Sequence, residues 1–99
     1  MKTVMVMKWE GVTPEQYEKV RQSVNWEGNK PTGALFHVAG FYKNALRVTD
    51  IWESEEDFNG FVQDRLMPGV AQAGIKGEPK VKFYPVQAIY LPDASRLTK

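Results

Sequence analysis

The chain has 99 residues, of which 42% are hydrophobic and 25% charged, a composition that predicts one small, soluble globular domain. Thirteen basic and twelve acidic residues nearly cancel, so neither nucleic acid nor an anionic membrane is an expected partner. The sequence contains no cysteine, which excludes disulfides, thiolate metal sites and cysteine nucleophiles and is compatible with a cytoplasmic location.

The first element expected along the chain is a strand over residues 3–9. Met5, Met7 and Trp9 alternate with Val4 and Val6, so both faces of this strand are largely apolar. No stretch here or later approaches the ~20 apolar residues that a membrane-spanning helix needs. We therefore expect an unprocessed protein that does not enter a membrane.

A helix is expected over residues 14–24. Thr13 is a favourable N-cap, Pro14 suits the first helical position, and Gln16 completes a capping box. Tyr17 begins a row of apolar residues at helical spacing.

A polar loop over residues 25–33 follows, and it contains an unexplained tryptophan, Trp26. Residues 34–41 and 45–52 are then two apolar segments separated by a short turn, which predicts a β-hairpin.

The second helix is expected to begin after Ser54. This serine is a good N-cap. The three acidic residues that follow it would stabilise the helix, because their negative charges lie at the positive end of the helix dipole. Phe58 and Phe61 would form part of its apolar face. Because Met67 precedes a proline, we expect the helix to stop or kink there, with residues 68–79 irregular or containing one short helical turn at Val70 to Ala73.

A last strand is expected over residues 80–90, interrupted by Pro85, which belongs at a sheet edge or a bulge. Residues 91–99 form a polar C-terminal tail. The expected organisation is one domain, 1–90, followed by the tail 91–99.

This order of elements, βαββαβ, predicts an α+β ferredoxin-like fold of the split βαβ type, a four-stranded antiparallel sheet with two helices on one face. The hairpin strands are apolar on both faces, although two helices can cover only one. A second copy of the sheet is the expected cover, so we predict a homodimer through the open sheet face.

Four segments resemble the antibiotic-biosynthesis-monooxygenase branch of the dimeric α/β-barrel superfamily, particularly its small uncharacterised members. They span nearly the whole chain and are Thr13-Pro14-Glu15-Gln16-Tyr17, Phe36-His37-Val38-Ala39-Gly40, Arg47-Val48-Thr49-Asp50-Ile51-Trp52-Glu53-Ser54 and Tyr84-Pro85-Val86. The resemblance implies a homodimeric barrel with a pocket between each sheet and its helices. It fixes no single reaction, since such proteins include cofactor-independent monooxygenases, haem-degrading enzymes, isomerases and proteins without known activity.

Haem degradation is not expected. The haem-degrading relatives carry an asparagine, a tryptophan and an iron-binding histidine at positions that correspond here to Met7, Phe61 and Ala71. All three functional residues are therefore absent. No cofactor and no metal site is predicted.

His37 is the only histidine and the natural candidate for proton transfer. Its partner depends on the hairpin register: one register places it on the face of Arg47 and Thr49, the other on the face of Asp50. Asp50 would orient the imidazole, and Arg47 could bind a carboxylate or polarise a carbonyl. A lone histidine on an apolar strand is also typical of a core residue whose hydrogen bonds are satisfied.

Residues expected to contact a ligand are mostly aromatic or sulfur-containing and lie on the first strand, both helices and the last strand. They are Met5, Met7, Trp9, Tyr17, Phe58, Phe61 and Tyr84, and core packing explains many of them as well.

Two functions of different class follow. In the first, the protein binds a small apolar or aromatic metabolite between sheet and helices and acts as a cofactor-independent monooxygenase or isomerase, with His37, Asp50 and Arg47 as catalytic candidates. In the second, it is a non-catalytic ligand-binding or assembly module.

Overall fold

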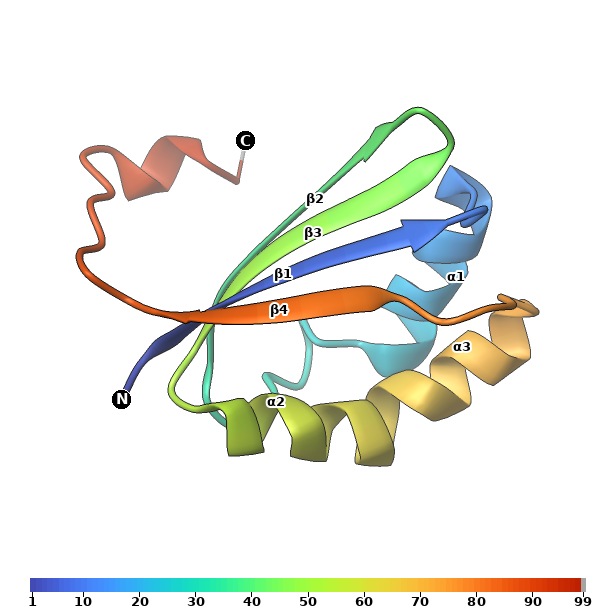
Figure 1. Cartoon of the computed structure of the whole chain (residues 1–99), viewed down its shortest axis with the longest axis horizontal. Coiled ribbons are helices and arrows are strands. Elements are labelled where there is room, and N and C mark those ends of the chain that lie inside the picture. The colour runs from blue at the N-terminus through green and yellow to red at the C-terminus, as the bar shows by residue number, and fades with distance from the viewer. Residues whose placement is uncertain (99) are drawn as a thin grey trace.

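A computed structural model describes residues 1–98 and contains one four-stranded antiparallel sheet (Figure 1). Its strands are β1 (Thr3–Glu10), β2 (Ala34–Tyr42), β3 (Ala45–Trp52) and β4 (Lys80–Pro85), in the order β2-β3-β1-β4. The predicted order of elements is confirmed. The last strand is shorter than expected, because it ends at Pro85 and does not continue to residue 90.

The two faces of the sheet differ in what covers them. Every second residue of β1 is buried on the side that faces the helices; these residues are Thr3, Met5, Met7 and Trp9. Val4 and Val6 point to the other side, which we call the open face because none of the helices between residues 14 and 73 covers it (Figure 1). One apolar side of β1 therefore packs in the core beneath the helices, and the other lies on the open face.

Helix α1 (Pro14–Val24) begins with the predicted capping box. The Thr13 side chain accepts a hydrogen bond from the Gln16 amide, and the Gln16 side chain accepts one from the Thr13 amide. The helix ends at Asn25, whose left-handed backbone conformation starts the following loop.

The second helical segment continues through Pro68 to Ala73, so of the two expectations at Met67, a stop or a kink, the stop is wrong, and residues 68–73 are helical rather than irregular. It consists of α2 (Glu55–Phe61), the π-helical turn η1 (Val62–Leu66) and α3 (Met67–Ala73). Met67 is helical, and its amide donates to the carbonyl of Val62, five residues earlier. Since this wider turn relieves the packing of a proline ring against the preceding turn, the helix accommodates Pro68.

Glycine is needed where the loop after α1 meets the start of α2. Gly33 has a φ of 81°, and a Cβ atom there would collide with the Asp57 carboxylate. The Gly33 carbonyl also accepts a hydrogen bond of 2.8 Å from the Glu53 amide. This close approach ties the loop to the β3–α2 junction.

After β4 the chain leaves the sheet. The Val86 amide donates to the Lys2 carbonyl, and a short 3₁₀ helix, η2 (Ala94–Arg96), follows on the side of the sheet away from the helices (Figure 1). Within residues 1–98, no helix is long and apolar enough to cross a membrane.

Candidate functional site

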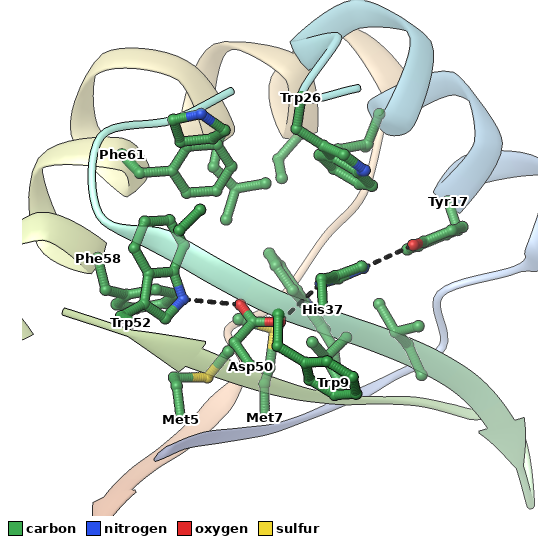
Figure 2. Close-up of a pocket in the computed structure, with 18 of the residues that line it drawn as sticks. Met5, Met7, Trp9, Tyr17, Trp26, His37, Asp50, Trp52, Phe58 and Phe61 are labelled. Atoms are coloured by element: carbon green, nitrogen blue, oxygen red, sulfur yellow. Dashed lines mark hydrogen bonds and ion pairs between the residues drawn. The ribbon is translucent and has the colours of Figure 1, made fainter. Parts of the chain in front are cut away.

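A cavity of about 330 Å³ lies between the covered face of the sheet and the helices. Met5, Met7 and Trp9 of β1 form its floor, while Phe58 and Phe61 close it from α2 (Figure 2). Its volume is within the range of small-molecule sites, and most of its wall is apolar. The cavity wall has few polar groups, so their positions determine where a ligand can form hydrogen bonds or exchange a proton.

The hairpin register places His37 opposite Asp50. The two strands are joined by a two-residue turn in which Lys43 and Asn44 both have positive φ, so Tyr42 pairs with Ala45 and the register follows. Of the two registers predicted, the one that brings His37 to Asp50 is therefore formed.

His37 and Asp50 are joined by a short hydrogen bond. Nδ1 of His37 lies 2.6 Å from Oδ1 of Asp50, whose residue is only 5% exposed. A carboxylate that accepts this bond keeps the imidazole proton on Nδ1 and orients the ring. The other ring nitrogen, Nε2, is then the one available as a base.

Trp52 supplies the second partner of the buried carboxylate. Its indole N–H donates to Oδ2 of Asp50 over 3.0 Å. Both oxygens of Asp50 are thus hydrogen-bonded, and within the part of the chain described no buried side-chain nitrogen or oxygen lacks a partner. This pairing explains how an aspartate is tolerated inside an apolar strand.

Tyr17 extends the hydrogen-bonded chain at its other end. Its hydroxyl lies 2.8 Å from Nε2 of His37 (Figure 2). Burial raises the pKa of Tyr17 to about 12, so the phenol keeps its proton at neutral pH and can donate it to Nε2. The result is a continuous relay, Tyr17–His37–Asp50–Trp52, along one wall of the cavity.

Six of the seven residues expected to contact a ligand line this cavity; these are Met5, Met7, Trp9, Tyr17, Phe58 and Phe61. The seventh, Tyr84, pairs with Val4 of β1 and is exposed on the open face.

Arg47 does not join His37. Its neighbours in the sheet are Gly40 and Lys8, and its guanidinium lies 5.7 Å from the centre of the Tyr42 ring on the open face. The alternative in which Arg47 shares a face with His37 needs the other register and does not form. In residues 1–98 no three His, Cys, Asp or Glu side chains are grouped so that they could hold a metal ion.

Two tryptophans of the cavity wall were not predicted from the sequence. Trp52 follows Asp50 by two residues, so the sequence predicts that both side chains lie on the same face of the strand. It does not predict the hydrogen bond between them. Trp26 lies in the polar loop, and its ring centre is 5.0 Å from that of His37. The only sign in the sequence that Trp26 lines the cavity is that it is a large aromatic residue in an otherwise polar loop.

No family model matches the chain, and no curated protein matches it in sequence. Solved structures do match it in shape. A protein of unknown function from Nitrosomonas europaea, NE2512, has a TM-score of 0.66 at 16% identity, over 93% of this chain and 95% of that one.

Two oxygenases are also similar in structure. SnoaB from Streptomyces nogalater, a cofactor-independent oxygenase, has a TM-score of 0.63 at 14% identity, over 93% of this chain and 97% of that one. The monooxygenase from the gene ActVA-Orf6 of Streptomyces coelicolor, crystallised with nanaomycin D, has a TM-score of 0.61 at 22% identity, over 92% of each chain. At these identities the likeness is one of fold, and in fold it confirms the expected resemblance to antibiotic-biosynthesis-monooxygenase-like proteins.

Proposed function

We propose that this protein binds a small, flat, mostly apolar molecule in the cavity and acts on it as a cofactor-independent monooxygenase or isomerase. The observation that supports this most directly is an apolar cavity of about 330 Å³ with an oriented imidazole, His37, on its wall. The oxygenases of the same fold make this class of chemistry the first to test.

Both reactions begin with the same step, removal of a proton from the ligand by Nε2 of His37. Asp50 stabilises the imidazolium that results, because its carboxylate faces Nδ1. In this structure Tyr17 occupies the hydrogen-bonding position at Nε2, so the ligand's O–H or C–H group must take that place.

The two reactions then differ in whether the carbanion or enolate reacts with a proton or with dioxygen. An isomerase returns the proton to another atom of the ligand. A monooxygenase lets the carbanion reduce dioxygen: a CH2 group becomes C=O, one oxygen atom enters the product and the other leaves as water. The ligand supplies all the electrons, so no redox cofactor is required.

Anthrone, a flat three-ring ketone with an acidic CH2 group, is a suitable probe. Calorimetry measures its binding, exchange of the CH2 protons for deuterium without oxygen measures proton abstraction, and an oxygen electrode measures oxygenation. His37→Ala should retain binding and lower the exchange rate by about 10²- to 10⁴-fold, the usual contribution of a general base.

The outcomes separate the alternatives. Binding with exchange and oxygen uptake supports an oxygenase, and binding with exchange alone supports an isomerase. Binding without exchange favours the non-catalytic ligand-binding module. Absence of binding, or an unchanged exchange rate in His37→Ala, contradicts the proposal.

We also propose that the chain forms a homodimer through its open face. Val6 and Val38 share that face and are 38% and 50% exposed, beside the partly buried Val4 and Ile51. An exposed apolar patch that crosses three strands is matched by an identical patch on a second copy related by a two-fold axis.

Light scattering after size-exclusion chromatography tests the dimer. Val38→Asp should yield a monomer, because it places a charge in the apolar interface. Met67→Asp is the matched control, since Met67 is equally exposed but lies on the helices. A wild-type monomer at micromolar concentration would contradict the dimer.

A further inference from the structure

Trp26 forms the wall of the cavity next to His37 (Figure 2). The ring centres of Trp26 and His37 are 5.0 Å apart, and those of Trp26 and Tyr17 are 6.0 Å apart. The indole therefore shields one side of the imidazole from water and limits the orientations of its ring. This contact matters because Trp26 belongs to a loop, whose backbone has no sheet or helix to fix it.

The loop closes on itself through a 2.9 Å hydrogen bond from the Asn29 amide to the Asn25 carbonyl, and Arg65 ties it to the second helical segment. One terminal nitrogen of its guanidinium, Nη2, lies 2.7 Å from the carbonyl oxygen of Val24 and 2.7 Å from that of Asn29. These two carbonyls lie on either side of Trp26 in the chain. A single cation thus joins the end of α1 to the far end of the segment that carries the indole, with a charge favourable to the helix C-terminus.

A second arginine holds the same loop from α1. Nε and Nη2 of Arg21 each donate to one carboxylate oxygen of Glu27 over 2.7 Å. This pair is exposed, so its contribution is small beside that of the Arg65 bonds, of which the one to Val24 is partly buried. Glu27, the residue after Trp26, is therefore tied to α1.

Arg65 lies in the π-helical turn η1 and reaches the loop from there. The turn contains one residue more than an α-helical turn would, as the bond from the Met67 amide to the Val62 carbonyl shows. The Arg65 guanidinium also lies 5.8 Å from the centre of the Phe61 ring, another part of the cavity wall. The irregular turn of the helix thus carries the side chain that contacts both the Trp26 loop and Phe61.

We propose that Arg65 is a positioning residue for His37: it holds residues 24–29 so that Trp26 remains against the imidazole and closes this side of the cavity. The effect on turnover rests on the proposed function of the cavity. The effect on the imidazole is a property of the protein alone and can be measured without a ligand.

The single histidine makes that measurement direct, because the imidazole protons of His37 are the only ones in the chain. The Trp26 ring should displace their NMR frequencies from those of an unstructured histidine through its ring current. In Arg65→Met this displacement should fall by about half or more, as the loop moves away. Arg65→Lys should restore most of it, since an ammonium can also donate to both carbonyls. Arg96→Met, a change in η2, is the control and should leave the displacement unchanged.

The second readout is the exchange of the anthrone CH2 protons. Arg65→Met should lower this rate by about tenfold, in line with the cost of a small misplacement of a catalytic group, while Arg96→Met should not. If Arg65→Met does not fold, Arg65→Gln, which is too short to reach both carbonyls, takes its place in the same comparison.

The inference is overturned if a folded Arg65→Met or Arg65→Gln protein keeps the wild-type imidazole frequencies. Its failure is distinguishable from that of the proposed function. If the wild-type protein does not bind anthrone but its imidazole frequencies still change when Arg65 is substituted, the positioning role of Arg65 stands and the proposed reaction is contradicted.

Discussion

The indole of Trp52 and the carboxylate of Asp50, two residues apart on β3, are joined by a 3.0 Å hydrogen bond inside the protein. Trp52→Phe should preserve most of the packing but leave one oxygen of a buried carboxylate without a donor. An unsatisfied buried acceptor costs about 1–3 kcal/mol, so the free energy of unfolding in urea should fall by about that amount.

A double-mutant cycle with Asp50→Leu isolates this bond. When the carboxylate is absent, Trp52→Phe removes an indole N–H that has already lost its acceptor, so it should cost no more than the small loss of packing. If Trp52→Phe costs the same with and without Asp50, the bond does not stabilise the protein.

Asp50→Asn should move the proton of the neutral imidazole. With Asp50, the carboxylate accepts from Nδ1 and the proton is on that nitrogen. An asparagine whose oxygen remains on the Trp52 N–H turns its amide toward Nδ1 and donates to it, so the proton should move to Nε2. Nitrogen-15 spectra of the only histidine distinguish the two tautomers, and an identical tautomer in both proteins would refute the assignment.

Ionisation of Tyr17 should be visible at high pH. Because burial raises the pKa of Tyr17 to about 12, absorbance near 295 nm should show a step there that is missing from Tyr17→Phe and present in Tyr90→Phe. A raised pKa means that the folded state binds the proton more tightly than the unfolded state. The associated stability is therefore fully present below about pH 10 and is lost as the pH rises through 12.

The unfolding free energy measured between pH 9 and 12 provides the second check. Wild-type protein should lose more stability over this range than Tyr17→Phe. Parallel curves for the two proteins would indicate that Tyr17 ionises equally easily in both states.

Gly33→Ala should destabilise the protein by more than about 1 kcal/mol, because its φ of 81° is strained for alanine and the added Cβ meets Asp57. Gly60→Ala is the matched control: nothing lies within 4 Å of a Cβ at that site in α2, and alanine should stabilise the helix by roughly 0.5–1 kcal/mol. Thermal unfolding of both variants measures the difference, and a neutral Gly33→Ala would contradict the close approach.

The order of strands and helices was predictable because it depends on local signals, such as the capping box at Thr13 and the alternation of β1. The passage of the helix through Pro68 was not, since a π-helical turn is favoured here by packing that the local sequence does not contain.

The site was predictable only in part, for the same reason. His37 and Asp50 were identified as candidates, but their contact depends on a two-residue turn at Lys43 and Asn44, whose sequence is only a weak signal for that conformation. The bonds of Tyr17 and Arg65 join elements distant in sequence, across 20 and about 40 residues, and periodicity says nothing about such pairs.

The π-helical turn also determines where the length of this chain can change. Because the turn holds one residue more than an α-helical turn, removal of one residue from Val62–Leu66 would restore a regular α-helix and leave the residues after it on their present faces. Val70 would stay buried against the core, and Gly69 would stay close to Val24 of α1. This turn is therefore a place where the helical segment can lose a residue while the two helices that enclose the cavity stay together.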